Sequence, residues 1–237
     1  MHNIRAITFD LDNTLWAIDP VIQRAEAMLW DWLSENYPRI SREHTPEAMI
    51  AVREQVIEEH WEKSHDYRFL RKKALERMAT TCGYSADLVE PAFAVFDRAR
   101  NEVEFYPDVM PALPRLANDF VLLAVTNGNA NLETIGIRHL FHDVISAAET
   151  GFAKPARPIF DKAVSLSGFA CGDILHVGDH PEIDIKGARE AGLRTAWMNR
   201  NDATWPDGIP GPDAIVTTFA ELLELLEPAA RRINQAK

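Results

Sequence analysis

The chain has 237 residues, 46% hydrophobic and 26% charged, a composition that excludes a largely disordered protein. With 25 Lys and Arg against 36 Asp and Glu, the formal net charge is −11. This balance argues against nucleic acid as a partner, because phosphate backbones are bound by clustered cations. The sequence shows neither an apolar run of the roughly 20 residues that span a membrane nor a signal-peptide pattern. We therefore expect a cytoplasmic protein without membrane or nucleic-acid partners.

The first predicted element is a short apolar segment, residues 4–9, which reads as a buried strand. From about residue 17 to residue 102, apolar residues recur at helical spacing in four stretches, and strand patterns are absent. This block predicts a small four-helix unit inserted after the first strand. Its Cys82, like Cys171 later in the chain, belongs to no C-x-x-C motif, so the two cysteines predict neither a disulfide framework nor a zinc site.

After Tyr106 and Pro107, strand and helix patterns alternate. Such alternation predicts a parallel, doubly wound sheet, and hence an α/β fold. The last ten residues, 228–237, are expected to fray. The predicted strands cover residues 120–125, 144–147, 174–177, 195–198 and 215–216. The predicted helices cover residues 107–116, 132–140, 158–166, 183–191 and 219–226.

The first motif with chemical potential is Phe9–Leu15, which places Asp10 and Asp12 at the end of the first predicted strand. Strand periodicity sends side chains at i and i+2 in the same direction. The two carboxylates would repel each other, and Mg²⁺, which prefers carboxylate and phosphate oxygens, would offset that repulsion. For an isolated D-x-D pair, two turn-forming aspartates are the plainer alternative.

Two further polar motifs follow the next predicted strands. Thr126, Asn127 and Gly128 offer a hydroxyl, an amide and backbone N–H groups that can bind phosphate oxygens. Lys154, just before Pro155, offers a compact cation that can hold a phosphate. Taken alone, the first motif could be a polar turn and Lys154 a solvated loop residue.

A fourth motif, His176–Asp184, closes a predicted strand and opens a helix. Its Asp179 and Asp184 add two carboxylates, although acidic residues are also common at helix N-termini. All four motifs lie at the carboxyl ends of predicted strands, where an open α/β sheet binds its ligands. Together they predict a nucleophile, a metal site, a phosphate site and a cation in one place.

In this order the four motifs resemble those of the haloacid dehalogenase superfamily. The resemblance covers essentially the whole α/β part, and the helical insert is similar to that superfamily's first-type cap. It implies a Rossmann-like, doubly wound parallel sheet formed by residues 1–16 and 103–237. It also implies an all-helical cap domain formed by residues 17–102, and Mg²⁺-dependent phosphoryl transfer through an aspartyl-phosphate.

The resemblance also implies catalytic roles. Asp10 would attack phosphorus as a carboxylate. Asp12 would protonate the leaving oxygen and then take a proton from the hydrolytic water. Lys154 would pair with the phosphoryl group and with Asp10, stabilising charge in the transition state. The substrate's phosphate oxygens would be bound by Thr126, Asn127 and Gly128.

A magnesium site is implied as well. The ligands to Mg²⁺ would be Asp10, the backbone carbonyl of Asp12, and Asp179. Asp184 would orient waters or Lys154 from outside the coordination sphere. The presence of Asp12 favours a phosphatase over the dehalogenases, which resemble this pattern but lack that carboxyl, since halide leaves without a proton. A phosphomutase, a phosphonatase and a catalytically silent binder of phosphate ligands stay open as alternatives.

The expected partner is a small phosphorylated metabolite, and the sequence does not indicate an oligomeric state. The strings Val125–Ala130 and His176–Asp179 resemble bacterial phosphatases linked to riboflavin synthesis and FMN hydrolysis. His180 departs from the residues often found after that aspartate and could alter hydrogen bonding around the metal. Trp16 could touch the cap. Several cap residues could stack on a flat ring or bind a second anion, or simply pack and face solvent: Trp61, His65, Tyr67, Arg68 and Arg71.

Overall fold

The computed structural model describes residue 1 and residues 3–235. The chain divides into two compact units. We call Met1–Ala17, Glu104–Gly128 and Gly136–Lys237 the core unit, and Ile18–Val103 with Asn129–Ile135 the helical unit. The sequence placed the residues from 129 to 135 in the α/β part, whereas this division groups them with the helices.

The core unit is built on a six-stranded parallel sheet with the order β3-β2-β1-β4-β5-β6. This arrangement confirms the predicted α/β, doubly wound fold. Strand β1 lies between β2 and β4, so the chain leaves the sheet centre in both directions, and such a switch point is where these folds bind ligands. The strands are β1 (Ala6–Phe9), β2 (Val121–Thr126), β3 (Asp143–Ser146), β4 (Ile174–Gly178), β5 (Arg194–Met198) and β6 (Ala214–Val216).

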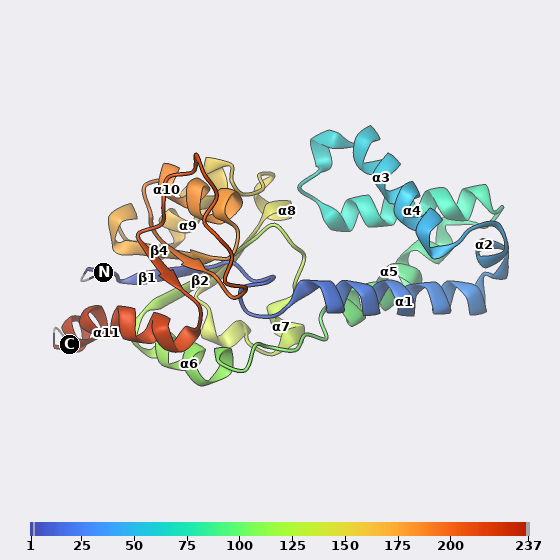
Figure 1. Cartoon of the computed structure of the whole chain (residues 1–237). Coiled ribbons are helices and arrows are strands. Elements are labelled where there is room, and N and C mark those ends of the chain that lie inside the picture. Colours follow the sequence, from blue (N-terminus) through green and yellow to red (C-terminus); the bar gives the residue numbers. More distant parts are fainter. Residues whose placement is uncertain (2, 236–237) are drawn as a thin grey trace. The chain divides into compact units, whose positions relative to one another are not determined.

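Helices cover both faces of this sheet (Figure 1). One face carries α6 (Val109–Asp119) and α11 (Phe219–Gln235), and the other carries α9 (Arg157–Ser167) and α10 (Gly187–Glu190). The short α8 (Ala147–Thr150) follows β3. Because both faces are covered, β1 and β4 are buried at every position, as expected of a parallel sheet.

Three predicted elements differ from the structure. The helix expected over residues 132–140 stops after α7 (Leu132–Ile135), because Gly136 takes a φ of +90°, and a 3₁₀ turn follows at Arg138–Leu140. The helix expected over residues 183–191 begins as a π-helical segment, Pro181–Lys186, and continues as α10.

The third difference concerns the end of the chain. Helix α11 continues through Pro228 to Gln235 instead of fraying at residue 228. The physical reason is burial, since Ala229 is 1% exposed and therefore still packs on the core. Arg232 also donates to the side chain of Asn3. Residues 236–237 of the expected tail lie outside the described part.

The helical unit contains five α-helices before residue 101 among its described residues, one more than predicted, besides two short 3₁₀ turns. The additional helix is α2 (Pro38–Glu43), a single short segment. The other four are α1 (Ile18–Asn36), α3 (Pro46–Glu59), α4 (Tyr67–Thr81) and α5 (Val89–Arg100). Side-chain caps start two of them, because Thr45 accepts from the Ala48 N–H and Asp66 from the Phe69 N–H, satisfying donors that a helix N-terminus leaves free.

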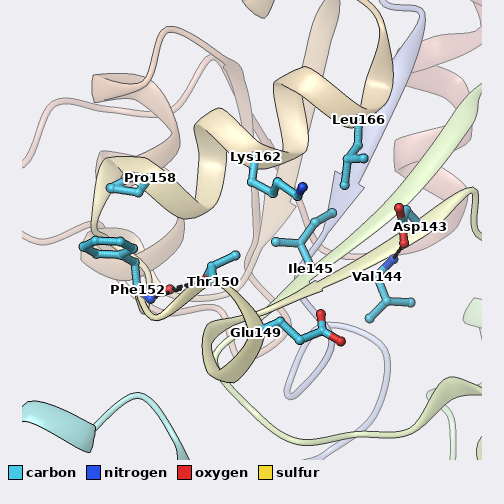
Figure 2. A pocket seen from close by; sticks show the side chains of 9 residues that line it. All are labelled: Asp143, Val144, Ile145, Glu149, Thr150, Phe152, Pro158, Lys162 and Leu166. Carbon is cyan, nitrogen blue, oxygen red and sulfur yellow. Dashed lines mark hydrogen bonds between the residues drawn. The ribbon is translucent and has the colours of Figure 1, made fainter.

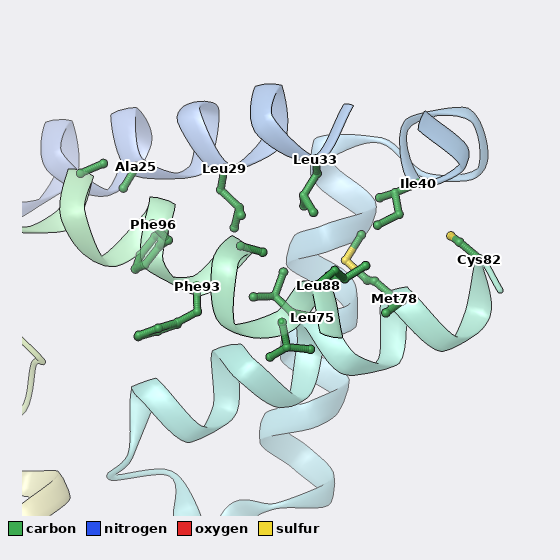
Figure 3. Close-up of a cluster of buried hydrophobic side chains, with 14 residues drawn as sticks. Ala25, Leu29, Leu33, Ile40, Leu75, Met78, Cys82, Leu88, Phe93 and Phe96 are labelled. Atoms are coloured by element: carbon green, nitrogen blue, oxygen red, sulfur yellow. The ribbon is translucent and has the colours of Figure 1, made fainter. Parts of the chain in front are cut away.

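A hydrophobic cluster of its own holds the helical unit together (Figure 3). Leu29 and Leu33 point from α1 toward helix α5, which contributes Phe93 and Phe96, and Leu75 and Met78 of α4 complete the cluster. Cys82 is buried there as a free thiol, whereas Cys171 of the core unit is only half-buried. Among the described residues, no helix is both long and apolar enough to cross a membrane.

Candidate active site

Asp10 directly follows β1, and the backbone fixes its position. Its N–H donates to the carbonyl of Val177 on β4 (2.9 Å). The loop then turns at Asn13, whose φ of +63° lies in the left-handed region that asparagine tolerates better than most residues. This turn brings Thr14 back, and its hydroxyl donates to Asp10 Oδ2 (3.1 Å). Thr14 belongs to the first motif, Phe9–Leu15, but the sequence pattern predicted no role for it.

Lys154 lies between two carboxylates. Its Nζ donates to Asp10 Oδ1 and to Asp184 Oδ1, both at 2.6 Å, and its side chain is 1% exposed. Burial by itself would lower the pKa of Lys154, but the two adjacent carboxylates outweigh burial and raise it. The side chain therefore stays an ammonium, as the predicted cation requires.

The side chain of Asn127 holds Lys154 in place. Asn127 Oδ1 accepts from the Lys154 N–H (2.7 Å), and Asn127 Nδ2 donates to the Lys154 carbonyl (2.9 Å). The sequence assigned Asn127 to phosphate binding, and nothing in its pattern signalled this second contact across 27 positions. The neighbouring Thr126 is buried, and its hydroxyl oxygen accepts from the Gly128 N–H (2.9 Å). That turn leaves the Thr126 O–H proton available as a donor.

Three carboxylates converge beside Lys154. Oxygens of Asp10, Asp179 and Asp184 lie within 4.8 Å of one another. Burial, together with the neighbouring carboxylates, raises the pKa of Asp10 to about 8 and that of Asp179 to about 7. For Asp184, burial acts upward, but the charge of Lys154 and the hydrogen bond to His176 lower its pKa.

The charge of this cluster fits a divalent cation. Three carboxylates face one ammonium, so full ionisation leaves two surplus negative charges in a buried place. Hard oxygen donors in such a group are the ligands that Mg²⁺ prefers. Asp10 and Asp179 are two of the predicted ligands, and Asp184, predicted to lie outside the coordination sphere, belongs to the same group of carboxylates.

Hydrogen bonds from His180 and Trp197 orient the aspartates of the fourth motif, His176–Asp184. The His180 N–H donates to Asp184 Oδ2 (3.0 Å), while the His180 ring accepts from the N–H groups of Glu182 and Ile183. His180 therefore caps the π-helical segment with its side chain and reaches Asp184 only through its backbone. From β5, Trp197 Nε1 donates to the Asp179 carbonyl (2.6 Å), a contact that sequence spacing does not reveal.

Asp12 is not part of the group of three carboxylates. Its Oδ1 accepts from Trp16 Nε1 (2.8 Å). Trp16, which the sequence suggested could touch the cap, is fully buried and packs edge-on against Phe105, also of the core unit (ring centroids 5.7 Å apart). The indole therefore fixes one oxygen of the Asp12 carboxyl, whose charge still contributes to the raised pKa of Asp179.

The cap residues singled out from the sequence do not form one cluster of free groups. Arg71 donates to Glu26 (2.9 Å) and lies over the ring of Phe96 (3.4 Å). Arg68 pairs with Asp97 (3.2 Å). Both arginines are thus engaged inside the helical unit, while Trp61 and Tyr67 are exposed.

A separate pocket of about 530 Å³ lies beside the edge strand β3 and helix α9 (Figure 2). Its lining combines Phe152, Pro158 and Leu166 with the charged groups of Glu149 and Lys162. None of the three clustered aspartates lines it. The pocket therefore lacks the arrangement of nucleophile, cation and metal ligands found after β1 and β4.

Comparison with known proteins agrees with this geometry. Residues 4–192 match the family model of haloacid dehalogenase-like hydrolases. Among curated proteins, the chain is 29% identical to 5-amino-6-(5-phospho-D-ribitylamino)uracil phosphatase YigB of Escherichia coli, over 95% of this chain and 98% of that protein. It is also 29% identical to the human N-acylneuraminate-9-phosphatase, over 100% and 99% of the two chains.

A solved structure gives the same fold. The 2-haloacid dehalogenase from Pseudomonas syringae pv. Tomato superposes with a TM-score of 0.89 at 35% identity, covering 94% of this chain and 98% of that one. The match of most of the chain to one family model, together with this superposition, is sufficient for assignment. The chain belongs to the haloacid dehalogenase-like hydrolases.

Proposed function

We propose that this chain is a Mg²⁺-dependent phosphatase that hydrolyses a small phosphorylated metabolite through an aspartyl-phosphate. The chain is a phosphoric monoester hydrolase, as its curated relatives are. One observation carries the proposed mechanism. Lys154 Nζ lies 2.6 Å from oxygens of both Asp10 and Asp184, which couples a buried cation to the predicted nucleophile in an acidic cluster suited to a divalent ion.

In the first half-reaction, an Asp10 carboxylate oxygen attacks phosphorus, and the bond from phosphorus to the ester oxygen breaks. Asp12 donates a proton to the departing oxygen, since an alkoxide is a poor leaving group without one. Lys154 stabilises the charge that develops on the phosphoryl oxygens. The Thr126 hydroxyl, whose proton is available, donates to one of those oxygens.

In the second half-reaction, Asp12 takes a proton from water, and the water oxygen attacks the phosphorus of the aspartyl-phosphate. The bond between phosphorus and the Asp10 oxygen then breaks, which releases inorganic phosphate and restores Asp10. The contact with Trp16 keeps the Asp12 carboxyl in one position for both proton transfers. Mg²⁺, held by Asp10 and Asp179, would neutralise charge on the attacking carboxylate and on the phosphoryl oxygens.

The substrate class follows from the relatives. The bacterial relative is named for a phosphorylated pyrimidine intermediate, which supports a riboflavin-pathway phosphate or FMN as the first compounds to test. We assign selection of the non-phosphate part of the substrate to the helical unit, as the cap domain. The structural neighbour named as a 2-haloacid dehalogenase supports a second candidate reaction, displacement of halide by Asp10. The carboxyl of Asp12 argues against it, because halide leaves without a proton.

The test measures phosphate release from a panel of phosphorylated metabolites that includes FMN, with Mg²⁺ and with EDTA. A parallel assay measures halide release from 2-chloropropionate. We expect metal-dependent phosphate release and no halide release. Asp10→Asn should reduce phosphate release by at least about 10³-fold while the far-ultraviolet circular dichroism stays unchanged. Asp12→Asn should slow turnover by about 10² to 10⁴-fold and allow the phosphorylated protein to accumulate.

Each contrary result has its own meaning. Near-normal phosphate release by Asp10→Asn contradicts the nucleophile assignment, and unchanged turnover by Asp12→Asn contradicts the acid–base role. Halide release would establish the dehalogenase reaction instead. If no compound in the panel releases phosphate, the proposed activity fails for that substrate class. The next assays are then phosphate transfer within a sugar bisphosphate, phosphonate cleavage, and binding of phosphate ligands without turnover.

A further inference from the structure

A buried row of polar groups continues from the acidic cluster into the sheet. Thr8 of β1 and His176 of β4 are register partners on adjacent strands, and both are fully buried. Thr8 Oγ1 lies 2.8 Å from His176 Nδ1, and His176 Nε2 lies 3.3 Å from Asp184 Oδ1. The same Asp184 oxygen accepts from Lys154 Nζ. The row therefore links the middle of the sheet to the ammonium that contacts Asp10.

The chemistry of these groups fixes the direction of each hydrogen bond. An ionised Asp184 can only accept, so His176 Nε2 must carry a proton and donate it. With the proton on Nε2, a neutral ring leaves Nδ1 as an acceptor. Thr8 is the donor to that nitrogen. Its hydroxyl thus holds the imidazole in the tautomer that Asp184 needs.

Asp184 has little freedom to compensate if His176 is lost. Its Oδ2 accepts from the His180 N–H, and its side chain packs directly on Gly178. A Cβ added to Gly178 would lie 2.6 Å from the Asp184 Cβ, a distance that no real contact allows. Gly178 and the His180 N–H therefore confine the Asp184 side chain. Lys154 and His176 limit the remaining movement of its carboxyl.

We infer that His176 is a positioning residue, which acts through Asp184 to hold Lys154 against the nucleophile Asp10, with Thr8 fixing its tautomer. This inference rests on the proposed phosphatase function. The simpler alternative is that His176 only fills space, because its ring also packs edge-on against Phe160 (centroids 5.2 Å apart). The two explanations predict different outcomes for variants that keep the volume and change the hydrogen bonds.

The first experiment needs no substrate. In protein labelled with ¹⁵N-histidine, long-range proton–nitrogen spectra report which ring nitrogen of His176 carries the proton, and the signal is assigned by its loss in His176→Gln. We expect a neutral ring with the proton on Nε2. A proton on Nδ1 alone would overturn the inference, whatever the outcome of the phosphatase assay.

The second experiment uses the substrate with the highest turnover in the panel. His176→Leu keeps volume but loses the donor, and should lower kcat by about 10- to 100-fold with KM changed by less than about threefold. His176→Gln places an amide N–H near the position of Nε2 and should recover most of that loss. Thr8→Val should lower kcat by a smaller factor, about three- to tenfold.

A control and a double variant separate positioning from packing. Thr195 of β5 is also fully buried and is the register partner of His176 on its other side, but its hydroxyl bonds to Asp213. Thr195→Val should lower the melting temperature about as much as Thr8→Val and leave kcat unchanged. If His176 acts through Asp184, His176→Leu should cost little in the Asp184→Asn background. Fully additive losses, or equal kcat in His176→Leu and wild type, would overturn the inference.

Discussion

Each unit of this protein contains a cluster of opposite charges, and the two clusters have opposite surpluses. In the core unit, Lys154 faces Asp10 and Asp184, and the side chains are between 1% and 10% exposed. In the helical unit, Glu26 faces Arg53 and Arg71, and the side chains are between 13% and 27% exposed. The core cluster is less exposed to solvent and carries a net negative charge. The helical-unit cluster is more exposed and carries a net positive charge.

This difference in burial and net charge distinguishes the candidate active site in the core unit from a structural ion pair in the helical unit. Arg71 completes its surroundings within the helical unit, because its guanidinium lies over Phe96 and its charge meets Glu26. The core cluster is not balanced by its own chain, since Asp179 adds a third carboxylate. Burying an uncompensated charge is costly, so an arrangement with surplus charge is stable only when a further ion or a proton joins it. That incompleteness suits a group that must bind and release ligands.

The largest expected difference in stability comes from removing the central cation of the core cluster. Lys154→Met leaves Asp10 and Asp184 buried without their partner, and should lower the free energy of unfolding by about 3 kcal/mol. It should also abolish phosphate release. Urea unfolding of the metal-free protein measures the first effect. Arg53→Met is the matched variant in the helical unit, and its cost should stay below about 1 kcal/mol because water reaches that pair. Equal costs would remove the distinction between the clusters.

A substitution at Asp179 tests the proposed Mg²⁺ affinity of the core cluster. Asp179→Asn removes one negative ligand, so the Mg²⁺ concentration that gives half-maximal phosphate release should rise by at least about tenfold. Asp161→Asn is the control, because Asp161 is an exposed aspartate of the same unit that pairs only with Arg157 in the described structure. An unchanged Mg²⁺ titration in Asp179→Asn would mean that this carboxylate does not bind the metal.

The smallest effect concerns the pH dependence of the helical unit. Arg71 and Arg53 outweigh burial and lower the pKa of Glu26 below its ordinary value of 4.5. A carboxyl whose pKa is lower in the folded state stabilises the fold above pH 4.5, and this contribution is lost as the pH falls through the folded-state value. Glu26→Gln should therefore cost about 1 kcal/mol at pH 7 and progressively less below pH 4.5.

Urea midpoints of wild type and Glu26→Gln across this pH range give the comparison. Glu59→Gln, which removes an exposed partner of Arg77, serves as the control and should shift the midpoint less at pH 7. A cost for Glu26→Gln that stays constant from pH 7 to pH 3 would show that the carboxylate charge contributes nothing, and that the two clusters do not differ through their electrostatics.

Several features of the fold could be predicted from local patterns. Apolar runs such as Phe120–Val125 indicated strands, and the alternation with helices indicated a parallel sheet, because both signals depend on neighbouring residues. Errors occurred where distant contacts decide the outcome. Pro228 suggested an end to the last helix, yet burial of Ala229 extends it. One error was local instead: the helix at residue 132 ends early at Gly136, whose φ of +90° the spacing of apolar residues did not indicate.

The sequence by itself determined the chemical inventory of this protein. The four motifs with Asp10, Lys154 and Asp179 follow strands, and the physics of a parallel sheet places the carboxyl ends of its strands at one edge. Only the tertiary structure decided how these groups meet. The clamp of Asn127 on Lys154, the indole of Trp16 on Asp12 and the row from His176 to Asp184 are side-chain contacts. They depend on side-chain rotamers and on how the loops fold back on the sheet, even where the partners are only four or eight positions apart. Local sequence patterns do not encode these choices.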